Sequence, residues 1–225
     1  AILIGGILAG AMIGLLNGFL VNVTELHPFI ITLGTQAIFR GITLIISDAR
    51  PVFGFNPMFT RVVAGRLLGI PVPAIIAVII ALALGFLTSR TKVGRNIYAL
   101  GGNKQSAWFS GIDVKLHTLI VFIISGTCAG IAGVVSTARV GAAEPGAGAG
   151  FETFAIAAAI IGGTSFFGGK GKIFGVVMGG LIIGVINNGL NLLTVPTYYQ
   201  QIVMGGLIIL AVTADKIFGG KQKGE

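Results

Sequence analysis

The stretch VPAIIAVIIALALGFLTSR, residues 72–90, decides the fold class. It carries no charge before Arg90, at its last position, and a second apolar run, TLIVFIISGTCAGIAGVVSTARV, occupies residues 118–140. Uninterrupted apolar runs of this length are typical of helices that cross a bilayer. Between the two lies the polar, basic and glycine-containing segment GRNIYALGGNKQSAWFSGID, residues 94–113. The sequence therefore predicts membrane-spanning helices joined here by a long polar connection.

The composition of the whole chain agrees with a membrane protein. Of 225 residues, 54% are hydrophobic and only 10% are charged, and the mean hydropathy is +0.97. A soluble domain carries about 25% charged residues, so membrane lipid is the expected surrounding. The net charge of +8 comes without a basic cluster beside exposed aromatic residues. We therefore expect no nucleic-acid partner, and assign the positive charge to cytoplasmic loops.

Apolar runs recur along the chain and predict an all-α, polytopic helical bundle with about seven crossing segments in a single transmembrane domain, residues 1–225. One of them, 152–168, is short and ends in a glycine-rich sequence, which indicates a broken helix. The predicted segments are 1–21, 29–47, 72–89, 117–138, 152–168, 173–194 and 197–214.

Glycine is unusually frequent, with 37 residues, and many glycines inside the apolar runs are four residues apart. Such spacing lets membrane helices approach closely, so its repetition predicts a tightly packed bundle. The pairs are Gly10/Gly14, Gly14/Gly18, Gly126/Gly130, Gly175/Gly179 and Gly180/Gly184.

The distribution of lysine and arginine predicts the orientation. If the loop 90–116 is cytoplasmic and the short segment 152–168 crosses, then residues 169–172 and the tail 215–225 are also cytoplasmic. That side then holds ten basic residues and the other side four, which agrees with the positive-inside rule. The ten are Arg90, Lys92, Arg95, Lys104, Lys115, Lys170, Lys172, Lys216, Lys221 and Lys223, and the four are Arg50, Arg61, Arg66 and Arg139.

Two loops, 48–71 and 139–151, then lie outside the cytoplasm. The first contains apolar residues and prolines that suggest a short surface helix or a docking ledge. Both loops fit plain connections and equally a landing site for an extracytoplasmic partner. In the second case rim charges would orient the partner, with Arg61, Arg66 and Glu144 as the candidates.

No catalytic or metal-binding motif is found in the sequence. A phosphate-binding loop ending at Gly169-Lys170 would need glycine at Thr164 and a hydroxyl residue at Gly171. The two histidines, His27 and His117, fall at the ends of predicted spans, where an interfacial position is the simplest explanation. We expect no enzyme activity, no catalytic residue and no metal or cofactor on this chain.

Polar side chains inside the spans are the candidates for a solute path. Arg40 is an intramembrane charge, which suggests either a functional site or a side chain that extends to the interface. Amides and hydroxyls, the latter at Thr32 and Thr35, could bind an uncharged solute such as a sugar, or could instead join helices to one another. The amide candidates for the path are Asn17, Gln36, Asn187, Asn188 and Asn191; on a helix, 187 and 191 share a face, as do 188 and 191.

The polar segment 94–113 has the pattern of a short amphipathic helix. Asn103 is suited to cap its start and Gly111 to end it. Ala107, Trp108 and Ile112 are predicted to share one stripe, with Phe109 beside it. An exposed tryptophan there fits an anchor in a partner's groove or a residue at the lipid interface.

Three segments of the sequence resemble the permease subunits of bacterial sugar ABC importers, the ribose/xylose/allose-type family. They are VGRNIYALGGNKQSAWFSGIDV, LNGFLVNVTELHPFIITLGTQAIFRG, and the C-terminal block from FETFAIAAAIIGGTSFFGGKGK through GVINNGLNLL to YYQ. Family members carry further N-terminal spans, so the chain resembles the C-terminal part of a longer permease. Trp108 and Phe109 stand where the family leads us to expect smaller residues.

The resemblance implies a multi-pass protein of the bacterial inner membrane that imports a monosaccharide, such as a ribose-type pentose, by alternating access. Its implied partners are a cytoplasmic ATPase subunit that binds ATP and Mg²⁺, a second permease copy or paralogue, and an extracytoplasmic sugar-binding protein. The segment 101–111 within the loop 90–116 would be the coupling helix that docks on the ATPase. The implied contact residues are Gly101, Gly102, Asn103, Lys104, Trp108, Phe109 and Gly111.

Two other classes of function remain open from the sequence. A stand-alone secondary carrier or channel would have the same apolar architecture, although the spans lack the buried carboxylates that ion coupling normally uses. An intramembrane enzyme would need a catalytic pair in the further N-terminal part that family members carry. Dependence on a separately encoded ATPase distinguishes the importer from both.

Overall fold

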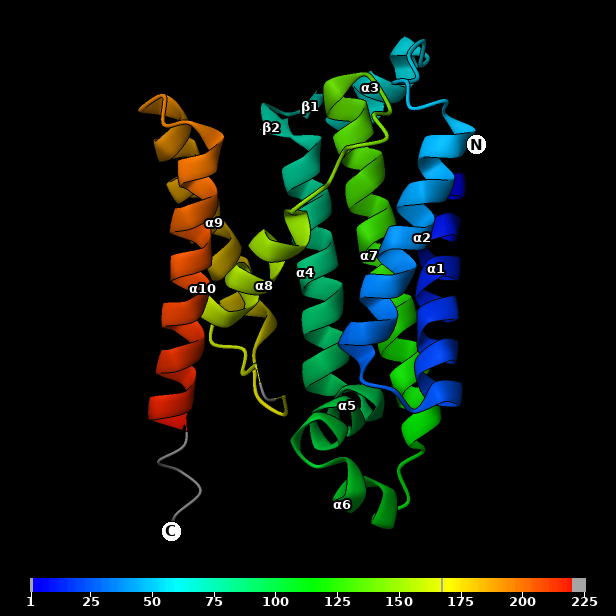
Figure 1. Cartoon of the computed structure of the whole chain (residues 1–225), viewed down its shortest axis with the longest axis vertical. Helices are drawn as coiled ribbons and strands as arrows, with labels where there is room; N and C mark the ends of the chain where they lie inside the picture. Colours follow the sequence, from blue (N-terminus) through cyan, green and yellow to red (C-terminus); the bar gives the residue numbers. More distant parts are fainter. Residues whose placement is uncertain (1, 167, 220–225) are drawn as a thin grey trace. The chain divides into compact units, whose positions relative to one another are not determined.

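The computed structural model describes residues 2–166 and 168–219, and the side chains up to residue 213. Within this part the regular secondary structure is almost entirely α-helical (Figure 1). The predicted tail 215–225 lies outside the described side chains. The elements are α1 (Ile2–Thr24), α2 (Pro28–Ile46), α3 (Pro57–Ala64), β1 (Arg66–Leu67), β2 (Ile70–Pro71), α4 (Val72–Arg90), α5 (Lys92–Gly102), α6 (Lys104–Phe109), α7 (Val114–Val140), α8 (Phe151–Ile161), α9 (Ile173–Leu192) and α10 (Thr197–Gly219).

Five of the described helices, α1, α2, α4, α7 and α9, are long and apolar enough to cross a membrane. They correspond to five of the seven predicted segments. The other two predicted segments form shorter apolar helices: α8 has 11 residues, and the apolar part of α10 covers Thr197–Thr213. The helical membrane bundle predicted from composition is therefore confirmed.

The chain folds into two compact units, which we describe separately. The first contains residues 1–79 and 113–147, and the second contains residues 80–112 and 148–225.

In the first unit α1 and α7 run side by side (Figure 1) with their backbones in direct contact. A methyl group added at Gly10 would overlap the carbonyl oxygen of Gly126 and lie 2.8 Å from the Cα atom of Gly130. Gly14 faces the backbone of Phe122 in the same way. Only glycine fits at these positions, because the neighbouring atoms belong to the opposite backbone. The close packing predicted from the glycine spacing is confirmed for this pair of helices.

The two predicted outer loops meet at the end of α7 in the same unit. The backbones of Val52 and Ala143 exchange two hydrogen bonds of 2.9 Å. Val63 of α3 is buried against Val134 and Ala138 of α7, so the short helix predicted within 48–71 exists and is packed. The sequence did not predict the hairpin β1–β2, in which Arg66 pairs with Pro71 around a two-residue turn.

In the second unit the broken helix predicted for 152–168 is observed. The helix α8 ends at Ile161, and Gly163 takes a left-handed conformation immediately afterwards. Gly162 packs against Gly175, and Gly179 against Ala158, so α8 and α9 touch backbone to backbone. Gly180 and Gly184 have no neighbour within 4 Å of an added methyl group, so the packing predicted for that pair is wrong.

Candidate functional site

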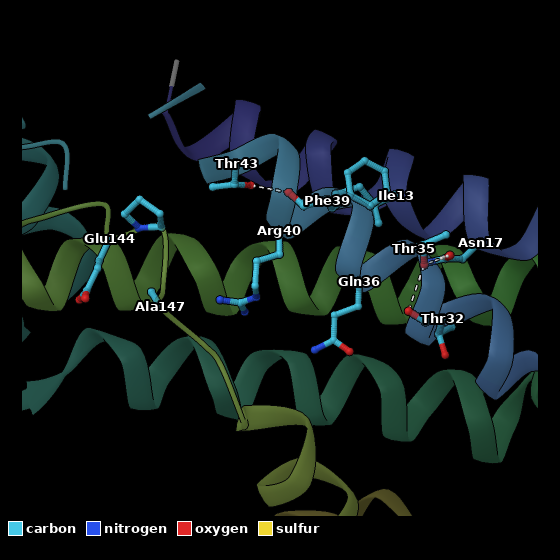
Figure 2. A pocket seen from close by; sticks show the side chains of 11 residues that line it. Ile13, Asn17, Thr32, Thr35, Gln36, Phe39, Arg40, Thr43, Glu144 and Ala147 are labelled. Carbon is cyan, nitrogen blue, oxygen red and sulfur yellow. Dashed lines mark hydrogen bonds between the residues drawn. The ribbon is translucent and has the colours of Figure 1, made fainter. Parts of the chain in front are cut away.

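A cavity of about 410 Å³ lies in the first unit between α1, α2 and the loop that follows α7. Figure 2 shows its side chains, most of which come from α2. The lining combines an aromatic ring and an aliphatic side chain with amide, hydroxyl, guanidinium and carboxylate groups. The residues are Ile13, Asn17, Thr32, Thr35, Gln36, Phe39, Arg40, Thr43, Glu144, Pro145 and Ala147.

Asn17 and Gln36, which the sequence predicted for the solute path, both line this cavity. The Asn17 amide oxygen also accepts a hydrogen bond of 2.7 Å from the hydroxyl of Thr35, which is only 7% exposed. Asn17 therefore joins α1 to α2 beside the cavity. The sequence left Thr35 open between a place in the solute path and a contact that joins helices, and in the structure its hydroxyl joins α2 to α1.

Arg40 and Glu144 are the two charged residues of the cavity lining. Figure 2 shows Arg40 and Gln36 projecting from the same side of α2, while Glu144 comes from the loop after α7. Among the residues that the structure describes, no hydrogen bond or ion pair is found for the Arg40 guanidinium. Glu144 was predicted as a binding-protein contact, and the structure places it in the wall of the cavity.

The three asparagines predicted for the path on α9 belong to the second unit and do not form one cluster. Asn191 accepts a hydrogen bond of 3.0 Å from the Gln200 amide of α10, and Gln200 also donates to the Val195 carbonyl at 2.9 Å. Asn191 thus joins two helices. Asn188 is exposed and Asn187 is half-buried.

The outer residues Arg61 and Arg66 are both exposed, on α3 and β1. Glu144 is exposed as well, and the Val52–Ala143 bridge ties its loop to the segment that precedes α3. The structure therefore brings the two predicted outer loops to one end of the first unit.

The polar loop forms two helices, and α6 has the predicted caps. The Asn103 side chain accepts a hydrogen bond of 2.9 Å from the Ser106 amide. Gly111 ends the element in a left-handed conformation, with its amide 2.9 Å from the Trp108 carbonyl. The capping predicted from the sequence is confirmed.

The predicted stripe on α6 is partly wrong. Ala107 is buried at 4% exposure, whereas Trp108 and Phe109 are 63% and 71% exposed. The two rings contact each other edge to face, with centroids 5.0 Å apart. The helix α6 has six residues, which make fewer than two turns and cannot form a long stripe. Its small residue Ala107 packs inward, and the aromatic neighbours Trp108 and Phe109 form an exposed pair.

The end of α5 rests on the glycine-rich connection between α8 and α9. The Tyr98 hydroxyl donates a hydrogen bond of 2.9 Å to the Gly171 carbonyl. A methyl group added at Gly101 would lie 2.8 Å from the Gly169 amide nitrogen, and one at Gly169 would lie 2.7 Å from the Cα atom of Gly102. The predicted contact residues Gly101 and Gly102 therefore have a partner within this chain, which no sequence motif indicated.

The two histidines have local structural roles. His27 caps α2 by accepting a hydrogen bond of 3.3 Å from the Phe29 amide. His117 is buried, with its Nδ1 atom 2.7 Å from the Asp113 carbonyl oxygen. In the part of the chain with defined placement, no three metal-binding side chains cluster.

Comparison with known proteins identifies one matching family. Residues 1–212 match the model of the family described as branched-chain amino acid transport system / permease component. No solved structure matches the chain.

Three curated relatives illustrate the similarity. The D-allose transport system permease protein of Escherichia coli (strain K12) is 70% identical over 96% of this chain and 67% of its own length. The ribose import permease protein of Haemophilus influenzae is 41% identical over 96% of this chain and 68% of its own. That of Bacillus subtilis is 43% identical over 89% of this chain and 63% of its own. The chain thus spans about two thirds of the length of these relatives.

Proposed function

The chain belongs to the branched-chain amino acid transport system / permease component family, and we propose that it is the membrane-spanning subunit of an ATP-driven importer for D-allose or a closely related aldose. The observation that carries this proposal is the 70% identity to a D-allose permease over 96% of the chain. Relatives that import ribose, galactose and arabinose favour a monosaccharide over an amino acid.

We infer that the protein is a multi-pass component of the bacterial cytoplasmic membrane. Five apolar helices are long enough to cross it, and α10 would make a further crossing. At 1.5 Å per residue the 11 residues of α8 extend about 16 Å, roughly half of the hydrocarbon thickness of about 30 Å. The remaining depth would be covered by the residues between α8 and the basic residues Lys170 and Lys172.

The contact between α5 and the connection 162–172 supports the predicted orientation. Tyr98 and Gly101 of α5 touch Gly171 and Gly169 directly, so residues 169–172 and the polar loop 90–116 lie on the same side. Both segments carry basic residues, and the positive-inside rule places them in the cytoplasm. The loops around α3 and Glu144 then face outward, where a sugar-binding protein would dock.

We propose that the exposed pair Trp108–Phe109 docks on a separate ATPase subunit that binds ATP and Mg²⁺. Adjacent exposed aromatic rings at a helix end are suited to fill a groove in a partner, while Asn103 and Gly111 fix the ends of the helix. A movement of α6 would be transmitted through α5 to α8 and α9. The contact of Gly101 in α5 with the backbone of Gly169 leaves no space to absorb a shift. A second permease copy or paralogue would complete the transporter.

The docking proposal is tested by Trp108→Ala combined with Phe109→Ala. The double variant is expected to insert normally but to lose most copurification with the ATPase and most ATP-dependent uptake, because the few anchor side chains that dominate an interface contribute about 2 kcal/mol or more each. Phe86→Ala is the matched control, since Phe86 is also exposed but lies on the apolar helix α4. Unchanged copurification and uptake in the double variant would show that α6 is not the docking element.

A further inference from the structure

The helix α2 is mainly apolar, but one of its faces carries a stripe of polar side chains. Four residues, Thr32, Gln36, Arg40 and Thr43, are spaced by four, four and three positions, which puts them on one face of the helix. We call them the α2 polar stripe. All four line the cavity of about 410 Å³, and Figure 2 shows them along the face of α2 that borders it.

Such a stripe cannot face hydrocarbon at low cost. The two threonine hydroxyls bond to their own helix: Thr43 donates to the Phe39 carbonyl at 2.8 Å, and Thr32 to the Pro28 carbonyl at 3.1 Å. Arg40 has no such local acceptor among the described residues. A guanidinium within a membrane helix faces protein or water, so the stripe borders a hydrated space or another subunit.

The lining of the cavity selects among possible occupants. Arg40 contributes one positive charge and Glu144 one negative charge, so the wall carries no net formal charge. A neutral polar solute therefore fits this wall better than an anion does. An anion would bind better to an arginine whose charge no nearby carboxylate balances. Amide, guanidinium and carboxylate groups match the donors and acceptors of sugar hydroxyls, and Phe39 and Ile13 offer an apolar surface. The volume lies within the range of about 300–1,000 Å³ typical of small-molecule sites.

We propose that the α2 polar stripe and Glu144 form the sugar-contacting wall of the permeation path, and that Gln36 and Arg40 touch the sugar. This inference rests on the proposed function, because it assumes that the solute is an aldose. Asn17 serves the wall indirectly, since its hydrogen bond to Thr35 fixes α2 against α1. The wall therefore consists mainly of one helix face rather than the scattered amides that the sequence suggested.

The test uses single cysteines in the assembled importer, in a Cys128→Ala background that removes the native thiol. Gln36→Cys places a thiol on the stripe, and Thr43→Cys does so with a smaller change of side chain. Ile38→Cys is the matched control: Ile38 is 60% exposed on the same helix but does not line the cavity. Each complex is treated with a charged, membrane-impermeant thiol reagent, and D-allose uptake is measured before and after.

We expect Gln36→Cys and Thr43→Cys to react at least about tenfold faster than Ile38→Cys, because thiols need water to ionise. The reaction should abolish most of the D-allose uptake in the two stripe variants and spare it in the control. Stripe cysteines that do not react, or that react without loss of uptake, would overturn the proposal. A Cys128→Ala background complex that takes up no aldose rejects the importer function itself, and the rate difference between Gln36→Cys and Ile38→Cys still decides whether the stripe faces water.

Discussion

The contact between α1 and α7 leads to a quantitative prediction for Gly10→Ala. The added methyl group would overlap the Gly126 carbonyl oxygen and lie 2.8 Å from the Gly130 Cα atom and 2.9 Å from its nitrogen. Carbon atoms in favourable contact are about 3.5–4.0 Å apart, so the helices would have to separate by roughly 1 Å. The obstructing atoms belong to a backbone and cannot rotate away.

Overpacking of this kind costs about 1–3 kcal/mol, and the better helix propensity of alanine offsets up to about 1 kcal/mol. We therefore expect Gly10→Ala to lower the free energy of unfolding by about 1–2 kcal/mol. Unfolding of the purified protein in mixed detergent micelles, followed by circular dichroism, measures this change. The control is Gly5→Ala on the same helix, where an added methyl group meets no atom within 4 Å and stability should not fall.

A second substitution across the interface tests the same contact. Gly126→Ala alone should destabilise by a similar amount, because its methyl group would overlap the Gly10 carbonyl oxygen. The double variant should cost less than the sum of the two, since the first substitution already separates the helices. If Gly10→Ala proves as stable as Gly5→Ala, the close approach of α1 and α7 is wrong.

Three other substitutions have defined outcomes. Gly179→Ala should destabilise the second unit by about 1–3 kcal/mol and neighbouring Gly180→Ala should not, because only the first faces a backbone at contact distance; equal unfolding curves for the two would contradict this packing. Asn17→Leu should cost about 0.5–1.5 kcal/mol in detergent unfolding, since it removes the hydrogen bond between α1 and α2 while the Thr35 hydroxyl keeps its bond to the Thr32 carbonyl; an unchanged midpoint would mean that α1 and α2 are held in another way. Tyr98→Phe removes the hydrogen bond to the connection 162–172 and should reduce sugar uptake per ATP hydrolysed, which parallel uptake and ATPase assays on one preparation measure; an unaltered ratio would exclude this contact from coupling.

Features that depend on local sequence could be predicted. The apolar runs identified the long helices, because their length matches the bilayer. The asparagine and glycine at the ends of α6 identified its caps, since these residue types act through their own backbone neighbours. The four-residue glycine spacing identified the packing of α1, because that pattern places glycines on one helix face.

Features that depend on distant partners could not be predicted in the same way. The same spacing at Gly180 and Gly184 meets open space, and the sequence does not say which glycine face has a partner. Asn191 was placed in a solute path by its position on α9, whereas its hydrogen bond goes to Gln200, beyond the turn at Thr194. Tertiary contacts of this kind decide between a polar group that lines a path and one that joins helices.

The α2 polar stripe lies between these two cases. Its spacing of four, four and three residues is visible in the sequence, so a search for polar residues at helical period would have found it. Glu144 lies about a hundred residues away in the chain, and only the structure shows that it lines the same cavity as the stripe. The Val52–Ala143 bridge, which positions the loop after α7, has no signal in the sequence. Arg40 was recognised as a charge within a span, but its place in a neutral wall was not.

The most direct test of the account is uptake of radiolabelled D-allose into proteoliposomes that contain the permease. The account predicts uptake only when the separately encoded ATPase subunit, the sugar-binding protein and ATP are all present, with loss of uptake when any one is omitted. Uptake by the permease alone, without ATPase subunit or ATP, would contradict the account and identify a stand-alone carrier.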